Sequence, residues 1–162
     1  MVQAKEGADM KTIPHEKNPA KAYLSRYRAL MLKCKAIERA INDALEGATS
    51  TTITLTPDKV QTSGAGERMA EQVIKAVDAT AYLETERQRA GEVMREIMAA
   101  IKSVPDDIQQ TLLIERYING RSFDQIQEDI HYERSNTFII HGKALWAVWQ
   151  YMKRKGIDGG AL

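Results

Sequence analysis

Apolar residues recur at alternating spacings of three and four along two long stretches of the chain. In the first stretch the repeating positions are Tyr23, Tyr27, Leu30, Cys34, Ile37, Ile41 and Ala44. In the second they are Met69, Val73, Ala76, Thr80, Leu83, Arg87, Ala90, Met94, Ile97 and Ile101. These spacings place each set on one face of a helix and are typical of heptad seams. The pattern predicts two long helices, with Thr80 and Arg87 as the weak points of the second.

Both helices fall in one predicted segment, residues 18–103, with a loop between them. Asn18-Pro19 is a typical helix start, because Asn caps the helix and Pro suits its first position. Residues 47–66 are rich in Thr, Ser and Gly and interrupt the repeat. We expect a loop there; the alternation around Ile53 and Leu55 would also suit a short strand, but nothing obvious would pair with it.

Two heptad helices joined by a loop predict an antiparallel hairpin, a dimeric coiled coil, or both. We expect a homodimer whose dimerisation seam uses the apolar heptad positions Tyr27, Leu30, Ile37, Ile41, Val73, Met94, Ile97 and Ile101. The simpler interpretation of the same stripe is a packed core rather than a cofactor pocket.

The C-terminal segment, residues 104–156, carries the signals of shorter helices. Val104-Pro105 ends the second long helix, since Pro disfavours a helical conformation in the residue before it. Acidic residues directly after Pro105 suit the first turn of a new helix. Asn119-Gly120 is a stop signal, because both residues tolerate the left-handed conformation of a helix C-cap.

A second short helix begins after Ser122, which with Gln125 forms a capping-box pair. A third helix is predicted from Glu133 or Arg134 to about Lys155. Two short helices followed by a basic one match the helix-turn-helix pattern.

Charge is segregated inside this C-terminal segment. Residues 106–133 contain seven acidic residues and two arginines, whereas residues 134–155 contain five basic residues and no acid. A helix with basic residues at both ends and no carboxylate suits a DNA duplex, because each neutralised phosphate releases a counterion. Cations in the last turn, at Lys153 to Lys155, are also favoured simply by the helix dipole.

Spacings of three and four along the third helix predict which positions point inward, namely Thr137, Ile140 or His141, Ala144 and Val148. The outward positions near its start are the candidate DNA-binding residues Arg134, Ser135, Asn136, Phe138, Ile139 and Lys143. Arg can pair with guanine, Asn with adenine, and Phe or Ile with a thymine methyl group. Candidate phosphate contacts are Arg121, Ser122, Lys153 and Arg154. Trp146, Trp149 and Tyr151 are expected to pack against the hairpin or a second subunit.

Composition excludes several other classes. The single cysteine, Cys34, fits a reducing cytoplasm. The sequence contains no run of eighteen apolar residues, so it predicts no membrane-spanning helix. Residues 1–17 are expected to be a disordered arm without a secretory signal, and residues 157–162 a flexible tail. Gly64-Ala65-Gly66 lacks the Lys of a phosphate-binding loop, and the histidines have no partners at metal spacing. We therefore expect no enzyme, metal, cofactor or small-molecule substrate.

Residues 117–145 resemble the helix-turn-helix of region 4 of bacterial sigma factors, from Arg116-Tyr117 through the glycine before the second helix to Lys143-Ala144-Leu145. Further motifs at Tyr23-Leu24, residues 61–70 and residues 115–120 extend the likeness over roughly residues 20–152. Together they resemble small sigma-region-4-like phage regulators related to the RinA and ArpU late-transcription activators. The implied fold is all-α, a long helical hairpin or coiled coil followed by a sigma-like helix-turn-helix.

Four positions depart from the sigma-like pattern. Gln127 replaces the small residue usual in the second helix, His131 the usual turn glycine, Glu133 the usual Ser cap and Thr137 the usual Val or Ile. Because each change disturbs a packing or capping position, the departures leave room for weak or partner-dependent DNA binding.

The resemblance implies a cytoplasmic protein of the bacterial host cell that binds double-stranded DNA by sequence. It would activate phage late genes for packaging and morphogenesis through host RNA polymerase. Two alternatives remain. One is a small-terminase-like DNA-packaging protein, which would form a ring of subunits. The other is a helical interaction protein that binds polymerase without reading DNA.

Overall fold

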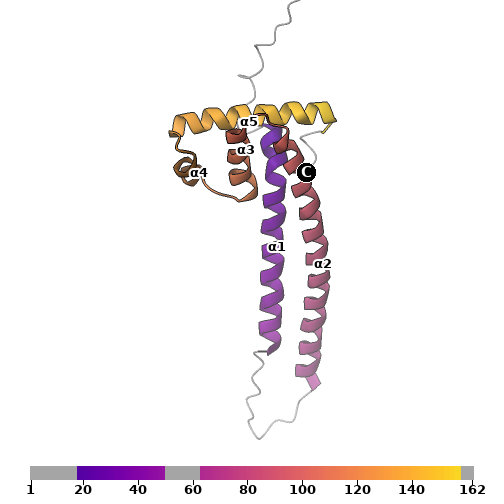
Figure 1. The fold of residues 1–162 in the computed structure, drawn as a ribbon. Helices are drawn as coiled ribbons and strands as arrows, with labels where there is room; N and C mark the ends of the chain where they lie inside the picture. The colour runs from indigo at the N-terminus through magenta and orange to yellow at the C-terminus, as the bar shows by residue number, and fades with distance from the viewer. Residues whose placement is uncertain (1–17, 50–62, 158–162) are drawn as a thin grey trace, which may run out of the picture. The chain divides into compact units, whose positions relative to one another are not determined.

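The computed structural model describes residues 18–49 and 63–157, and every regular element in these ranges is helical (Figure 1). The elements are α1 (Pro19–Thr49), α2 (Ser63–Lys102), α3 (Asp107–Leu113), a π-helical turn η2 (Ile114–Ile118), α4 (Phe123–Ile130) and α5 (Arg134–Lys155). The predicted all-α fold, with a long α1–α2 hairpin followed by shorter helices, is confirmed. The predicted arm over residues 1–17 and most of the tail lie outside the described residues.

The ends of the hairpin helices partly correct the expected loop. The prediction placed the loop at residues 47–66, but α1 continues to Thr49 and α2 already begins at Ser63. Packing overrides the weak helix propensity of the small residues, because Ala48 is buried and Gly47 lies close to Gln72 of α2. The possible strand around Ile53 and Leu55 falls outside the described residues. The start of α1 was predicted well: the Asn18 side chain accepts a hydrogen bond from the amide of Ala20 at 2.9 Å.

The described residues divide into two compact units, one within residues 29–91 and one formed by residues 18–28 and 92–157. In the first unit, α1 and α2 enclose a core of buried side chains. It consists of Cys34, Ile41, Ala76 and Leu83, with Ile37, Ala44 and Ala79 packed against it. Ile37 and Ile41 of the predicted dimerisation seam therefore pack within a single chain.

Every second position of the α2 seam lies one residue earlier in the sequence than predicted. Ala76, Leu83, Ala90 and Ile97 are buried as expected. The positions between them, however, are Ala79, Glu86 and Val93, which are half-buried or buried. The predicted Thr80 and Arg87 are exposed, Val73 is 40% exposed and Met94 is half-buried. This arrangement keeps Thr80 and Arg87 in water, but it buries a carboxylate at Glu86.

The second unit has its own core, and α3 and α4 pack against α5 within it (Figure 1). Its largest fully buried side chains are Leu24, Ile97, Ile101, Val104, Leu112, Leu113, Ile126, Thr137, His141, Leu145, Val148 and Met152. Of the two predicted inward alternatives on α5, His141 is buried and Ile140 is half-buried. Within the described residues, no helix is long and apolar enough to span a bilayer.

Candidate nucleic-acid interface

The chain reaches α4 through a sharp turn that the sequence signals directly. After η2, Gly120 has φ +78°, in the left-handed region that the Asn119-Gly120 stop predicted. A Cβ at this position would take the left-handed conformation at a steric cost, and it would lie only 3.0 Å from the guanidinium carbon of Arg28, which would have to shift. The turn sets where α4 begins.

The predicted capping box at the start of α4 is present. The Ser122 hydroxyl accepts a hydrogen bond from the Gln125 amide at 3.2 Å, and the Gln125 side chain accepts one from the Ser122 amide at 2.9 Å. The Ser122 side chain is therefore committed to holding the helix end. Its predicted role as a phosphate contact would compete with this structural role.

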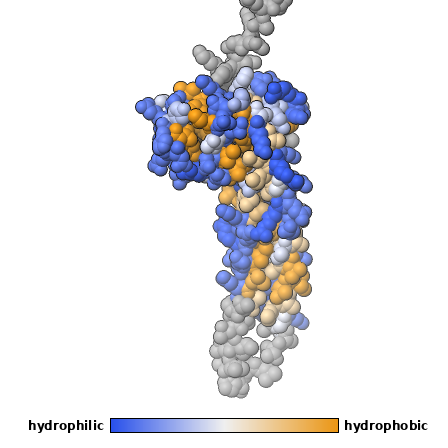
Figure 2. Space-filling model, viewed as in Figure 1, coloured by the Kyte–Doolittle hydropathy of each residue, from blue (hydrophilic) through white to orange (hydrophobic). Residues whose placement is uncertain are grey.

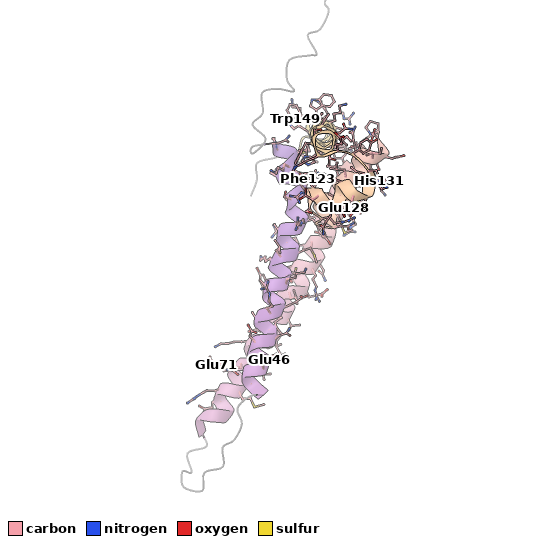
Figure 3. All side chains as sticks on the ribbon, turned by 90° about the vertical axis from the view of Figure 1, so that its left-hand side faces the viewer. Glu46, Glu71, Phe123, Glu128, His131 and Trp149 are labelled. Atoms are coloured by element: carbon pink, nitrogen blue, oxygen red, sulfur yellow. The ribbon has the colours of Figure 1, made fainter. Side chains whose placement is uncertain are left out.

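The connection between α4 and α5 is three residues long and contains two of the four departures from the sigma-like pattern. His131 adopts φ +55°, the left-handed conformation that the usual glycine would take without steric cost. Glu133 occupies the N-cap position of α5 but makes no side-chain capping hydrogen bond. Figure 3, in which α5 is seen end-on, shows His131 at this turn. The turn therefore has a left-handed residue and an N-cap position, although the glycine and serine of the sigma-like pattern are absent.

The other two departures are Gln127 on α4 and Thr137 on α5. Thr137 is fully buried, and its hydroxyl donates a hydrogen bond to the Glu133 carbonyl at 3.1 Å, which satisfies the polar group. Gln127 is less well accommodated, since its Nε2 is buried without a hydrogen-bond partner among the described residues. Such a group costs about 1–3 kcal/mol. The structure therefore accommodates Thr137 without an unsatisfied polar group, whereas Gln127 leaves a buried donor unsatisfied.

An aromatic cluster packs α5 against η2 and the first residue of α4. The ring of Phe123 lies 4.9 Å from Phe138 and 5.0 Å, edge-on, from His141. The Tyr117 hydroxyl lies 3.0 Å from Nε2 of His141, and both residues are buried. Burial raises the pKa of Tyr117 to about 12. The Arg116 guanidinium lies 4.7 Å from the Phe123 ring centre. These contacts set the orientation of the first half of α5.

The outer face of that half of α5 carries all six candidate DNA-binding residues. Arg134, Ser135, Asn136, Phe138, Ile139 and Lys143 are all exposed, while Thr137, His141 and Ala144 on the same stretch of α5 are buried. Two of the six also have partners within the chain. Arg134 lies 3.4 Å from Asp124 and 5.9 Å above the Phe138 ring, and Phe138 packs on Phe123. The six side chains spread over about half of the helix circumference, and Phe138 is less exposed than Ile139, at 38% against 56%.

The candidate phosphate contacts are not equivalent. The Arg121 guanidinium pairs with Asp129 and lies 3.5 Å from Glu115, and the hydrogen bond to Asp129 raises its pKa. Lys153 lies 3.6 Å over the Trp149 ring, and it and Arg154 are exposed in the last turn of α5. The two C-terminal residues are thus more accessible to a phosphate than Arg121.

Of the three aromatic residues expected to pack against the hairpin or a second subunit, Trp146 is 44% exposed in the single chain, and Trp149 and Tyr151 are half-buried. Ile139, at 56%, lies about two turns before Trp146 on the same helix. The signal that could have revealed this exposure was the spacing of seven between the two residues, which places both on the outer face.

The sequence matches no known protein family, no curated protein and no solved structure. The likeness to phage regulators therefore rests on the motifs alone.

Proposed function

We propose that this protein binds duplex DNA by sequence through α4 and α5, and that it regulates phage late transcription together with host RNA polymerase. The observation that carries the proposal is the division of α5 into two faces. Thr137, His141 and Ala144 lock one face into the core, while the opposite face presents basic, amide and apolar side chains on a helix without a carboxylate. A recognition helix requires this division.

In the proposed complex the first half of α5 lies in the major groove. Arg134 pairs with guanine, Asn136 with adenine, and Ile139 contacts a thymine methyl group. Arg134 must first leave Asp124, which costs little because an exposed ion pair contributes about 0–1 kcal/mol. Lys143, Lys153 and Arg154 neutralise phosphates along the backbone.

The test is selection of binding duplexes from a random pool, followed by anisotropy titration of the enriched sequence at two salt concentrations. Arg134→Ala is expected to lose about 1–3 kcal/mol of specific affinity and to relax the preference at one base pair. Lys143→Ala is expected to weaken all duplexes and reduce the salt dependence. Lys35→Ala, which removes an exposed charge from the first unit, is the matched control and should bind like the wild type. Failure to enrich any sequence would reject direct readout.

One observation favours a second candidate, a protein that binds polymerase without reading DNA. Ile139 and Trp146 expose apolar surface on the same face of α5, and such surface also suits a protein partner. Under this alternative, Trp146→Ala would abolish polymerase binding, and Arg134→Ala would leave it unchanged. The first proposal predicts that Arg134→Ala impairs promoter binding whatever the effect of Trp146→Ala.

A further inference from the structure

Gly142 lies in the interior of α5, and the fold of the described residues gives no reason for a glycine there. Apart from proline, glycine is the least favourable residue inside a helix. Gly120 and Gly156 have positive φ values that suit glycine, whereas Gly142 does not. A Cβ added at Gly142 would meet no other part of the described chain within 4 Å. Neither backbone conformation nor packing therefore accounts for this glycine.

The side chains that flank Gly142 along the helix are large and exposed. Ile139 precedes Gly142 by three residues and Trp146 follows it by four, so both are its neighbours on the helix surface. They are 56% and 44% exposed. Because position 142 has no side chain, another molecule can approach the helix backbone more closely between Ile139 and Trp146 than at either of them.

The charge of α5 indicates which kind of molecule comes close. Lys143 is exposed directly after Gly142, and α5 contains no carboxylate from its first residue to its last. A basic surface of this kind attracts a polyanion. A protein partner would favour a contiguous apolar patch, but Figure 2 shows hydrophobic residues interspersed with hydrophilic ones over the short C-terminal helices. The duplex of the proposed complex is therefore the occupant that the charge favours.

In that complex α5 cannot stay in the major groove over its whole length. Its 22 residues make a rod about 33 Å long, whereas the groove winds once around the duplex within about 34–36 Å. Beyond the turn that carries Asn136 and Ile139, the helix therefore has to cross one of the sugar–phosphate strands that border the groove. Gly142 lies about 4.5 Å along the helix axis beyond Ile139, where this crossing is expected.

We propose that the bordering sugar–phosphate strand crosses α5 at Gly142, and that the Lys143 ammonium pairs with a phosphate of that strand. This inference rests on the proposed function, because it takes the orientation of α5 in the groove from it. The absence of a side chain at Gly142 lets the duplex come close enough for Asn136 and Ile139 to reach the base edges. Ile139 and Trp146 then lie on the two sides of the strand.

Substitution of Gly142 separates the stability of the fold from the binding of DNA. Gly142→Ala should raise the unfolding temperature by about 2–4 °C, because alanine favours a helix and its methyl group enters open space. The same variant should bind the enriched duplex about fivefold more weakly, and Gly142→Leu about a hundredfold more weakly, because the added atoms hold the strand away from the helix. The salt dependence of binding should not change, since neither variant removes a positive charge.

Gly91→Ala and Gly91→Leu are the matched controls. Gly91 lies inside α2, is exposed, and has nothing within 4 Å of an added Cβ. Gly91→Ala should stabilise the fold as Gly142→Ala does, and neither control should change the anisotropy titration.

Three outcomes would count against the proposal. A Gly142→Leu protein that binds the duplex as tightly as the wild type would overturn it and leave sequence-specific binding standing. A lower unfolding temperature for Gly142→Ala would also overturn it, because the fold itself would then require the glycine. A wild type that enriches no duplex would reject the proposed function and this inference together, so the two failures are distinguishable.

Discussion

The Lys33 ammonium lies 3.0 Å from the carboxylate of Glu86, a side chain that is almost fully buried between α1 and α2. The same lysine lies 5.0 Å over the Tyr82 ring. A hydrogen bond from Lys33 lowers the pKa of Glu86 below its ordinary value of 4.5. The displaced seam of α2 buries the Glu86 carboxylate. Lys33 offsets the cost of this burial, because a buried charge is unfavourable unless it is paired.

The buried pair predicts an acid-sensitive hairpin. Because the folded-state pKa of Glu86 lies below the unfolded value, its contribution to stability is present above pH 4.5 and is lost as the pH falls through the folded pKa. Urea unfolding on both sides of that pH should show a smaller acid-induced loss of unfolding free energy in Glu86→Gln than in the wild type. Lys33→Met should reduce the loss in the same way. Parallel curves for wild type and Glu86→Gln would contradict the assignment.

The α2 seam also shows where sequence reasoning reached its limit. The apolar repeat, the Asn18 cap, the Ser122–Gln125 capping box and the Gly120 turn follow from local rules, and each was predicted. The choice between Arg87 and Glu86 as the inward residue does not follow from α2 alone. It depends on Lys33, 53 positions earlier in the sequence, which can neutralise a carboxylate but not a guanidinium.

In the candidate interface, too, the features set by local sequence were predicted, and those set by packing between helices were not. Its six outward residues followed from the period of α5. The partners of Arg134 and Arg121, which are Asp124 and Asp129 on α4, depend on how two helices pack and could not be read from spacing.

The left-handed turn at His131 predicts a stabilising substitution. A residue with a Cβ at φ +55° carries a steric cost of about 1–2 kcal/mol, part of which the greater freedom of glycine in the unfolded chain offsets. His131→Gly should therefore raise the unfolding free energy by about 0.5–1 kcal/mol in chemical denaturation. His131→Ala is the control, because it keeps a Cβ in the left-handed conformation. Since the exposed imidazole contributes little, His131→Ala should leave the unfolding free energy nearly unchanged. Destabilisation by His131→Gly would show that the side chain, not the backbone, matters here.

Gly120 predicts the opposite effect. Gly120→Ala forces a Cβ into a left-handed conformation and against the Arg28 guanidinium, so it should destabilise by about 2–3 kcal/mol. Gly156→Ala is a matched control, because Gly156 has φ +63° and nothing within 4 Å of the added Cβ. Thermal unfolding should show a smaller loss, about 1–2 kcal/mol, for the control. Equal losses in the two variants would mean that Arg28 moves aside freely, and adding Arg28→Ala to Gly120→Ala would then recover nothing.

The buried Tyr117 hydroxyl predicts an alkaline transition in the second unit. Its pKa is about 12 in the folded protein, against an ordinary value of 10.0. Above pH 10 the unfolded chain therefore releases this proton before the folded protein does, and stability falls until the pH passes the folded value. The two-unit difference corresponds to a loss of up to about 3 kcal/mol.

Tyr117→Phe separates this effect from that of the other titrating groups. The variant should start about 1–3 kcal/mol less stable at neutral pH, because Nε2 of His141 loses the hydroxyl 3.0 Å away. It should then lose less stability than the wild type between pH 10 and 12. Denaturant titrations at several alkaline pH values give both quantities, and tyrosinate absorbance follows the ionisation itself. A wild-type curve no steeper than that of Tyr117→Phe would show that the Tyr117 hydroxyl ionises as readily in the folded protein as in the unfolded chain. The contact with His141 would then not shield it from water.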